Sequence, residues 1–248
     1  MNDSKKPIMI AHRGFRVGVV ENTCQAFDKA VEMEMDYMEI DVHLSSDGKL
    51  VVIHDETVDR VFAGSGDVVA LSFDELSKFK SKDGEQSIPL LENVLSGYQG
   101  KIKFMIELKG DETGVPAAQL VKEKNMVDQV VFSSRSIVNL EGAMKGLSPD
   151  PAKLCLNITK CEDFPTKQLL KANSAKELPL PFQMISLRST LVGKDYIEKC
   201  HDLSIIALCW DFLSTKKPMK VAKKLLKMGI DGYLFDDPEM VLDFKKEI

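Results

Sequence analysis

The chain has 248 residues, of which 44% are hydrophobic and 29% are charged, the composition of a globular protein with a sizeable core. Its 33 basic and 38 acidic side chains give a net charge of −5, which argues against a general nucleic-acid surface because such surfaces carry a basic excess. An acidic protein that handles an anionic substrate must gather positive charge locally, from a metal or from a few Arg and Lys side chains.

Five scattered cysteines without a CxxC pair favour buried thiols in a reducing compartment over a disulfide framework or a zinc site. The N-terminus has a polar head and then a short apolar run, so it lacks the features of a signal peptide. No stretch approaches the roughly 18 apolar residues of a membrane span. We therefore expect a cytoplasmic protein without stable membrane association.

The first elements alternate between apolar strands and one helix. Residues 7–11 are predicted to form a strand, and Asn22 is expected to cap a helix, with Gln25 three residues later as in a capping box. A second strand is predicted over Tyr37–Leu44, and residues 50–54 return beside it after a Ser-Asp-Gly turn.

Residues 55–85 break this alternation. They are rich in Gly, Ser, Asp and Lys, with one short helical piece at 73–79. A loop of this length inside a compact domain is usually functional. We predict a small insertion after the second strand region, within a single domain of residues 1–248.

Beyond residue 85, strands and helices alternate regularly. Strands that form continuous apolar runs are typical of a buried parallel sheet. About eight such strands, each followed by a helix, predict an α/β protein, a TIM (β/α)8 barrel, for which about 250 residues is typical. The later strands are expected at 102–108, 129–132, 153–158, 183–187, 204–209 and 232–235, and the helices at 90–98, 116–124, 137–145, 167–175, 194–201, 219–228 and from 238.

Three carboxylates are expected to meet at the mouth of the barrel, because active sites of this fold lie at the C-terminal ends of the strands. Glu39 and Asp41 are two residues apart on one strand and so face the same side, and Glu107 occupies the equivalent place on the next barrel strand. Close carboxylates repel unless a cation lies between them, and oxygen ligands suit Mg²⁺ and Ca²⁺. Each acid alone is better explained as a solvated loop residue; the three together favour one divalent cation, Mg²⁺ or Ca²⁺, with Mn²⁺ also acceptable.

Two cations lie next to these acids. Arg13 follows the first strand, and Lys109 is two residues from Glu107 and on the same side. Arginine binds phosphate oxygens in bidentate fashion and lysine as a point charge, so both are candidates for contacting a phosphate. For Lys109, ordinary ion pairing with nearby carboxylates is an equally good alternative.

Two of the four histidines, His12 and His54, end apolar strands. Imidazole is suited to proton transfer near neutral pH, so we predict that they form a general acid/base pair for phosphoryl transfer. His43 is at most a supporting group, and His201, in a polar patch at a helix end, is expected at the surface. Trp210 ends the seventh strand, where it is either a packed core residue or a wall of the substrate pocket.

Together, these short motifs resemble the glycerophosphodiester phosphodiesterase family. Each motif is weak alone, but their ordered combination is specific and covers nearly the whole chain. The resemblance rests on His12-Arg13-Gly14, Glu21-Asn22-Thr23, Glu39-x-Asp41, His54-Asp55 with Thr57 and Asp59-Arg60, Ile88-Pro89-x-Leu91-Glu92 (with Leu90 as x), Glu107-x-Lys109, Trp210, and Gly229-x-Asp231-Gly232 followed by Asp236.

The resemblance implies a TIM barrel in which residues 55–85 are the family's insertion. Members of this family cleave glycerophosphodiesters, such as glycerophosphocholine, to sn-glycerol 3-phosphate and an alcohol. The attack of the glycerol 2-hydroxyl gives a cyclic phosphate that water opens. The residues that match the family's metal, acid/base and phosphate positions are Glu39, Asp41 and Glu107; His12 and His54; and Arg13.

Four places depart from the family pattern. The chain has Val20 where Pro is usual, Asp211 and Phe235 where Thr is usual, and Ser133-Ser134 without the aromatic often found there. None of these removes a predicted ligand or proton carrier. They leave the pockets for the alcohol and for the glycerol undefined.

Two other functions use the same residues. A lysophospholipase D or sphingomyelinase D-like activity on lipid phosphodiesters needs an apolar channel and a membrane-facing segment, which the acidic charge does not favour. A non-catalytic phosphodiester-binding protein should have lost site residues, yet every predicted position is filled. The sequence leaves open the alcohol, the metal, which histidine is the acid, and the oligomeric state.

Overall fold

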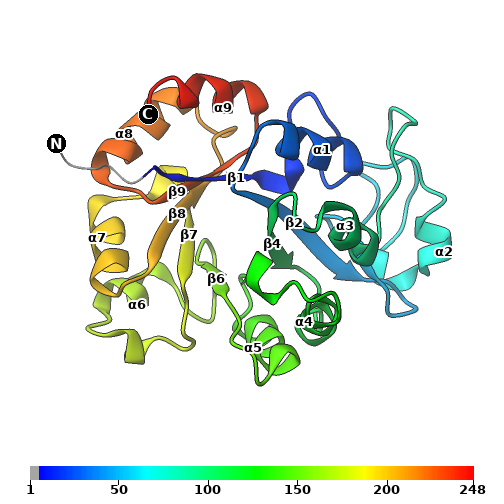
Figure 1. Cartoon of the computed structure of the whole chain (residues 1–248), viewed down its shortest axis with the longest axis horizontal. Coiled ribbons are helices and arrows are strands. Elements are labelled where there is room, and N and C mark those ends of the chain that lie inside the picture. The colour runs from blue at the N-terminus through cyan, green and yellow to red at the C-terminus, as the bar shows by residue number, and fades with distance from the viewer. Residues whose placement is uncertain (1–5) are drawn as a thin grey trace.

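The structure is a computed structural model, and it describes residues 6–248. Eight parallel strands follow one another around a closed barrel, in which the last strand pairs back to the first (Figure 1). The predicted TIM barrel is therefore confirmed. The barrel strands are β1 (Ile8–Ala11), β2 (Tyr37–Leu44), β4 (Lys103–Leu108), β5 (Val130–Ser134), β6 (Leu154–Asn157), β7 (Met184–Arg188), β8 (Ile206–Trp210) and β9 (Gly232–Phe235).

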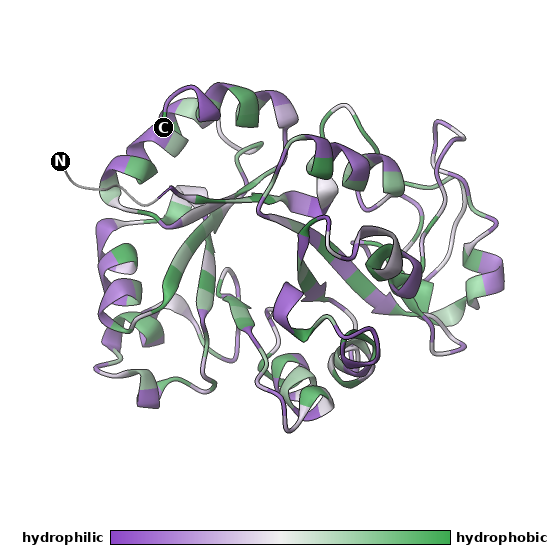
Figure 2. Cartoon of the chain, viewed as in Figure 1, coloured by the Kyte–Doolittle hydropathy of each residue, from purple (hydrophilic) through white to green (hydrophobic). Residues whose placement is uncertain are grey.

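Helices surround the strands, and their apolar sides pack against the barrel. In Figure 2 the strands are mostly hydrophobic, whereas the helices carry both hydrophilic and hydrophobic residues, as expected for elements with one buried face. The predicted helix at 167–175 is shorter in the structure and ends at Lys171. The covering helices are α1 (Cys24–Glu32), α3 (Leu91–Tyr98), α4 (Gly114–Glu123), α5 (Ile137–Leu147), α6 (Thr166–Lys171), α7 (Lys194–Asp202), α8 (Pro218–Met228) and α9 (Pro238–Lys245).

The two-residue period of the strands divides the core into two layers. On β4, Phe104, Ile106 and Leu108 pack outward against the helices, whereas Met105 points into the barrel among other apolar side chains. Glu107 follows Met105 on the inward side. The barrel interior is thus apolar below and polar at the C-terminal ends of the strands, which is where a site can form.

A short strand, β3 (Leu50–Val52), pairs antiparallel with the end of β2 outside the barrel. The predicted return strand at 50–54 therefore ends early, and His54 lies in the segment that follows. Residues beyond it form the excursion at the right of Figure 1, which contains α2 (Phe73–Leu76) and a small apolar cluster around Phe62. Its description as the family's insertion, within one domain, stays a prediction.

The cysteines and the helices of residues 6–248 bear on two of the predictions made from the sequence. Four cysteines are buried, but Cys24 is exposed at the start of α1, so the prediction of buried thiols is wrong for that residue. Across residues 6–248, none of the helices has the length and apolar character needed to cross a bilayer.

Candidate active site

β2 and β4 bring three carboxylates to one point of the mouth. Asp41 is in register with Glu107 on the neighbouring strand, and Glu39 lies two residues before Asp41 on the same side of β2. One oxygen from each of the three lies within 4.8 Å of the others. All three side chains are buried, with Glu39 at 0% exposure. Such a group could hold a metal ion.

Glu39 lacks the partners that a buried charge needs. Its Oε2 accepts a hydrogen bond from the backbone N–H of Arg13 at 2.7 Å, but its buried Oε1 has no hydrogen-bond partner among residues 6–248. Burial and the charges of Asp41 and Glu107 raise the pKa of Glu39 well above its usual range. A hard divalent cation would satisfy the free oxygen, so this donor set fits Mg²⁺ or Ca²⁺.

Asp41 is held in its charged form by the groups around it. Burial alone would raise its pKa, but Arg13 and Lys109 lower the pKa well below its usual range. Arg13 Nε lies 3.3 Å and Lys109 Nζ lies 3.6 Å from its oxygens. Asn22 Nδ2 donates to Asp41 Oδ2 at 2.9 Å, and its Oδ1 accepts from the Asp41 backbone N–H at 3.2 Å.

The predicted capping role of Asn22 is wrong. Thr23 is the residue that precedes α1, without a capping bond from its side chain. Asn22 has a positive φ of 56°, a left-handed conformation that asparagine tolerates, and it turns its amide toward β2 instead of the helix. Gln25 Oε1 accepts from the backbone N–H of Val20 at 3.1 Å. The hydrogen bonds of Asn22 with Asp41 therefore take the place of the predicted helix cap.

His12 lies at the end of β1 in a short turn, His12–Gly14, and is 5% exposed. Its Nδ1 is 2.7 Å from Asp236 Oδ1 at the end of β9, and its Nε2 is 3.9 Å from Glu39 Oε2. Burial would raise the pKa of Asp236, but His12 and Arg16 lower it. The charged carboxylate holds the proton on Nδ1 of His12 and leaves Nε2 directed toward the carboxylate cluster.

His54 has a similar arrangement on the other side of the cluster. Its Nδ1 lies 2.6 Å from Asp55 Oδ1, and its Nε2 lies 3.2 Å from Lys109 Nζ. Burial lowers the pKa of His54, and the charges of Arg13 and Lys109 act in the same direction. His43, expected to be a supporting group at most, donates through Nε2 to the backbone carbonyl of His54 at 3.2 Å.

Lys109 is placed between the cluster and His54. Its Nζ donates to Glu107 Oε1 at 3.2 Å, so the ion pairing that the sequence left as an alternative is present. Burial would lower the pKa of Lys109, but Glu107 and Asp41 raise it. Lys109 therefore remains an ammonium at the edge of the cluster.

Glu21 ties the excursion to the mouth through three arginines. Its carboxylate accepts from Arg13 at 2.7 Å, from Arg60 at 2.6 Å and from Arg16 at 3.3 Å. Burial would raise the pKa of Glu21, but Arg60 and Arg13 lower it to about 2. Arg60 also bonds Asp55, the partner of His54. Reasoning from residue types gave none of these four pairings, since the partners are charged groups in loops.

Trp210 lies where the apolar core of the barrel meets the mouth. It belongs to the apolar cluster inside the barrel and is 9% exposed, and its ring lies edge-on to His12 with the ring centres 6.1 Å apart. Its Nε1 donates to Thr159 Oγ1 at 3.1 Å, which fixes the indole. The ring therefore forms part of the mouth beside His12.

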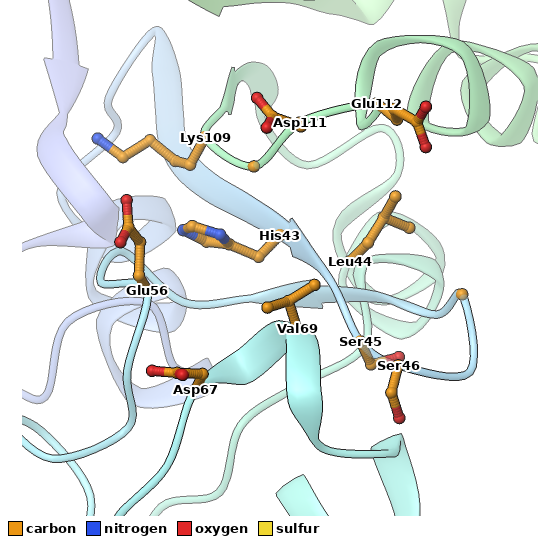
Figure 3. A pocket seen from close by; sticks show the side chains of 12 residues that line it. His43, Leu44, Ser45, Ser46, Glu56, Asp67, Val69, Lys109, Asp111 and Glu112 are labelled. Carbon is orange, nitrogen blue, oxygen red and sulfur yellow. The ribbon is translucent and has the colours of Figure 1, made fainter.

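A pocket of about 670 Å³ opens next to Lys109, on the side of the excursion (Figure 3). In Figure 3 the side chains of Lys109, His43 and Glu56 lie close together along one side of it. Its other charged lining residues are all acidic: Asp67, Asp111 and Glu112. Lys109 lines the pocket and also donates a hydrogen bond to Glu107, so the pocket adjoins the carboxylate cluster.

The mouth gathers groups that could hold a cation, transfer protons and bind phosphate oxygens, the kinds of group that a phosphoryl-transfer enzyme needs. The sequence matches the model of the glycerophosphoryl diester phosphodiesterase family over residues 12–240. The chain therefore belongs to this family, as its motifs indicated, and is a phosphodiesterase.

Individual relatives agree with this family. YhdW of Bacillus subtilis is 32% identical over 244 residues, which make up 94% of this chain and 96% of the relative. The glycerophosphodiester phosphodiesterase of Caldanaerobacter subterraneus subsp. tengcongensis is 30% identical over 254 residues, covering 98% and 99% of the two chains. A phosphodiesterase of Oleispira antarctica, solved with the product sn-glycerol-3-phosphate, has the same fold, with a TM-score of 0.77, 21% identity and 97% of both chains covered.

Proposed function

We propose that the chain hydrolyses glycerophosphodiesters to sn-glycerol 3-phosphate and an alcohol, with one divalent cation and with His12 and His54 as acid and base. The observation that carries this proposal is the convergence of three buried carboxylates between two histidines that are each held by an aspartate; one carboxylate oxygen has no hydrogen-bond partner within residues 6–248. The substrate class is supported by the family and by the product bound to the Oleispira relative.

Glu39, Asp41 and Glu107 would hold the cation, and Mg²⁺, Ca²⁺ and Mn²⁺ all suit three carboxylates and water. When bound, the cation neutralises phosphate charge and makes a nearby hydroxyl more acidic. Arg13 and Lys109 lie against the same carboxylates, at 3.3 Å and 3.6 Å from Asp41, so both can offer N–H groups to phosphate oxygens beside the cation.

The two histidines divide the proton transfers. Lys109 is an ammonium and donates to His54 Nε2, which favours a neutral His54 that accepts the proton of the attacking glycerol 2-hydroxyl. The hydroxyl oxygen bonds to phosphorus, the bond from phosphorus to the alcohol oxygen breaks, and His12 gives that oxygen a proton. Water then opens the cyclic phosphate, with the two proton transfers reversed. Trp210 contributes a wall of the pocket next to His12.

Alanine variants of the two histidines test this mechanism. We expect His12→Ala and His54→Ala each to lower the rate of glycerol 3-phosphate release at least about a hundredfold, the lower range for acid/base groups. His201→Ala is the matched control, because His201 is an exposed surface histidine paired with Asp231. Unchanged turnover in both site variants would contradict the mechanism. Chelator-treated enzyme should be inactive and recover with one of the three cations.

A lipid phosphodiesterase would need an apolar channel next to the cluster. The pocket beside Lys109 is lined by four carboxylates instead, which does not favour an acyl chain. Comparing the turnover of glycerophosphocholine with that of lysophosphatidylcholine decides between the two, and a clear preference for the lipid would overturn the proposal. A cytoplasmic location and the absence of nucleic-acid and membrane partners stay predictions.

A further inference from the structure

Two arginines share the indole of Trp210 at the end of β8. Arg135 directly follows β5, and Arg188 ends β7. Their guanidinium carbons lie 5.6 Å and 5.0 Å from the centre of the indole ring. The same ring lies edge-on to His12, the group that we propose to protonate the leaving alcohol.

Both arginines have a buried donor that makes no hydrogen bond. In the described part of the chain, the Nε atom of each is buried and has no hydrogen-bond partner. Asp211 Oδ2 lies 3.2 Å from Arg188 Nε, but out of line for a hydrogen bond. Unpaired buried donors are unfavourable, and two guanidinium groups beside one ring repel each other. An anion between them would satisfy the donors and remove the repulsion.

We propose that Arg135 and Arg188 form a subsite for a second anionic group of the substrate, a phosphomonoester or carboxylate carried by the leaving alcohol. This inference rests on the proposed function. A free tryptophan face would attract a quaternary ammonium such as choline, but the indole of Trp210 already has two cations beside it. Arg13 and Lys109 remain for the phosphate that is cleaved.

The acid-lined pocket beside Lys109 also favours binding of the second anionic group at the arginines. The carboxylates that line this pocket (Figure 3) repel an anionic alcohol and favour its binding at the arginines beside Trp210 instead. The pocket could take a cationic head group, but its acids, Glu56, Asp67, Asp111 and Glu112, are exposed and therefore solvated without a ligand. The buried Nε atoms of the arginines are shielded from solvent and make no hydrogen bond within residues 6–248.

Two substrates that differ only in one phosphomonoester test the proposal: glycerophosphoglycerol and its terminal phosphate ester, with glycerophosphocholine as the cationic comparison. We expect kcat/KM for the phosphate ester to exceed that for glycerophosphoglycerol at least about tenfold, because one strong charge-assisted contact has about this effect. Arg135→Gln and Arg188→Gln should each lower this ratio about tenfold. Lys227→Gln removes an exposed cation at the far end of α8 and should leave the ratio unchanged.

Binding provides a second readout, independent of turnover. Calorimetry on the metal-loaded His54→Ala protein should show that the phosphate ester binds with a lower Kd than glycerophosphoglycerol. Adding Arg135→Gln to this protein should remove the difference between the two Kd values. If Arg135→Gln does not fold, Arg135→Lys keeps the charge without the planar fork, and should lower the ratio of the Kd values by a smaller factor.

The outcomes separate the two proposals. If no diester is hydrolysed, the proposed function fails, and the ratio of the Kd values still decides the anionic subsite. A ratio near one, a preference for glycerophosphocholine, or an equal loss on both glycerol diesters in the arginine variants would overturn the subsite. The last of these would show that the arginines serve the cleaved phosphate or the fold.

Discussion

Removing the charge of Glu39 should separate metal binding from folding. Glu39→Gln keeps the shape of a fully buried side chain and removes a carboxylate that burial and two neighbouring acids disfavour. Without metal, the variant should therefore melt at the same temperature as the wild type or at a higher one. With metal, it should lose the stabilisation that the wild type gains, because a neutral amide replaces a charged ligand.

The size of the metal effect follows from linkage. A cation at about one hundred times its Kd stabilises the folded state by about 2.7 kcal/mol. In a domain of this size each kcal/mol raises Tm by about 2–4 °C, so the wild type should gain roughly 5–11 °C. Scanning calorimetry of chelator-treated protein, titrated with Mg²⁺, Ca²⁺ or Mn²⁺, measures this. Glu141→Gln, which removes an exposed carboxylate from α5, should keep the full gain.

Two results would refute this reasoning. A metal-free Glu39→Gln protein that melts well below the wild type would show that the buried charge is favourable in the folded state without a cation. An equal metal-induced gain in the wild type and the variant would show that the cation binds elsewhere in the molecule.

Three further perturbations test other parts of the mouth and the surface. The folded pKa of Glu21 is about 2, below its ordinary value of 4.5, so Glu21→Gln should lower the free energy of unfolding by up to about 3 kcal/mol at pH 7. The stabilisation that ionised Glu21 provides is complete above pH 4.5 and is lost as pH falls through the folded pKa. The free energies of unfolding of the two proteins in urea should therefore converge toward pH 2. Gly14→Ala and Gly48→Ala both place alanine at a positive φ, but only the new Cβ at Gly14 meets another atom, Ala26 Cβ at 2.8 Å; Gly14→Ala should be less stable than Gly48→Ala by about 1–3 kcal/mol in urea unfolding, and equal losses would contradict the packing argument. A thiol reagent should modify Cys24 alone in the folded protein and all 5 cysteines after unfolding, and rapid reaction of the buried thiols in the folded state would be inconsistent with the structure.

The barrel could be predicted because its signal is local and repeated. The Tyr37–Leu44 strand agrees with the structure to the residue, since its ends coincide with changes in the apolar pattern. The return strand does not: β3 ends at Val52, whose backbone N–H bonds Pro89, although the N–H of Ile53 still bonds Asp41 of β2. The end of β3 depends on residues far along the chain, which a local pattern cannot contain.

The same distinction explains which parts of the site could be foreseen. Glu39, Asp41 and Glu107 were predicted to converge because the two-residue period and the order of parallel strands are simple geometric rules. The partners of the histidines and of Asn22 depend on packing instead. His12 and Asp236 are 224 residues apart, and they meet because β1 and β9 close the barrel. The family motifs include Asp236, but the motifs alone do not say what it touches.

The charges at the mouth give the cation a second role in the proposed reaction. Without a cation, the raised pKa of Glu39 favours its neutral form, so Asp41 and Glu107 only balance Arg13 and Lys109, and the cluster has no net positive charge for a phosphodiester anion. A divalent cation held by all three ionised carboxylates would give the cluster one net positive charge. In the proposed reaction, the cation would therefore make the cluster of this acidic chain attractive to an anionic substrate, whereas the arginines at Trp210 keep their positive charge in either state.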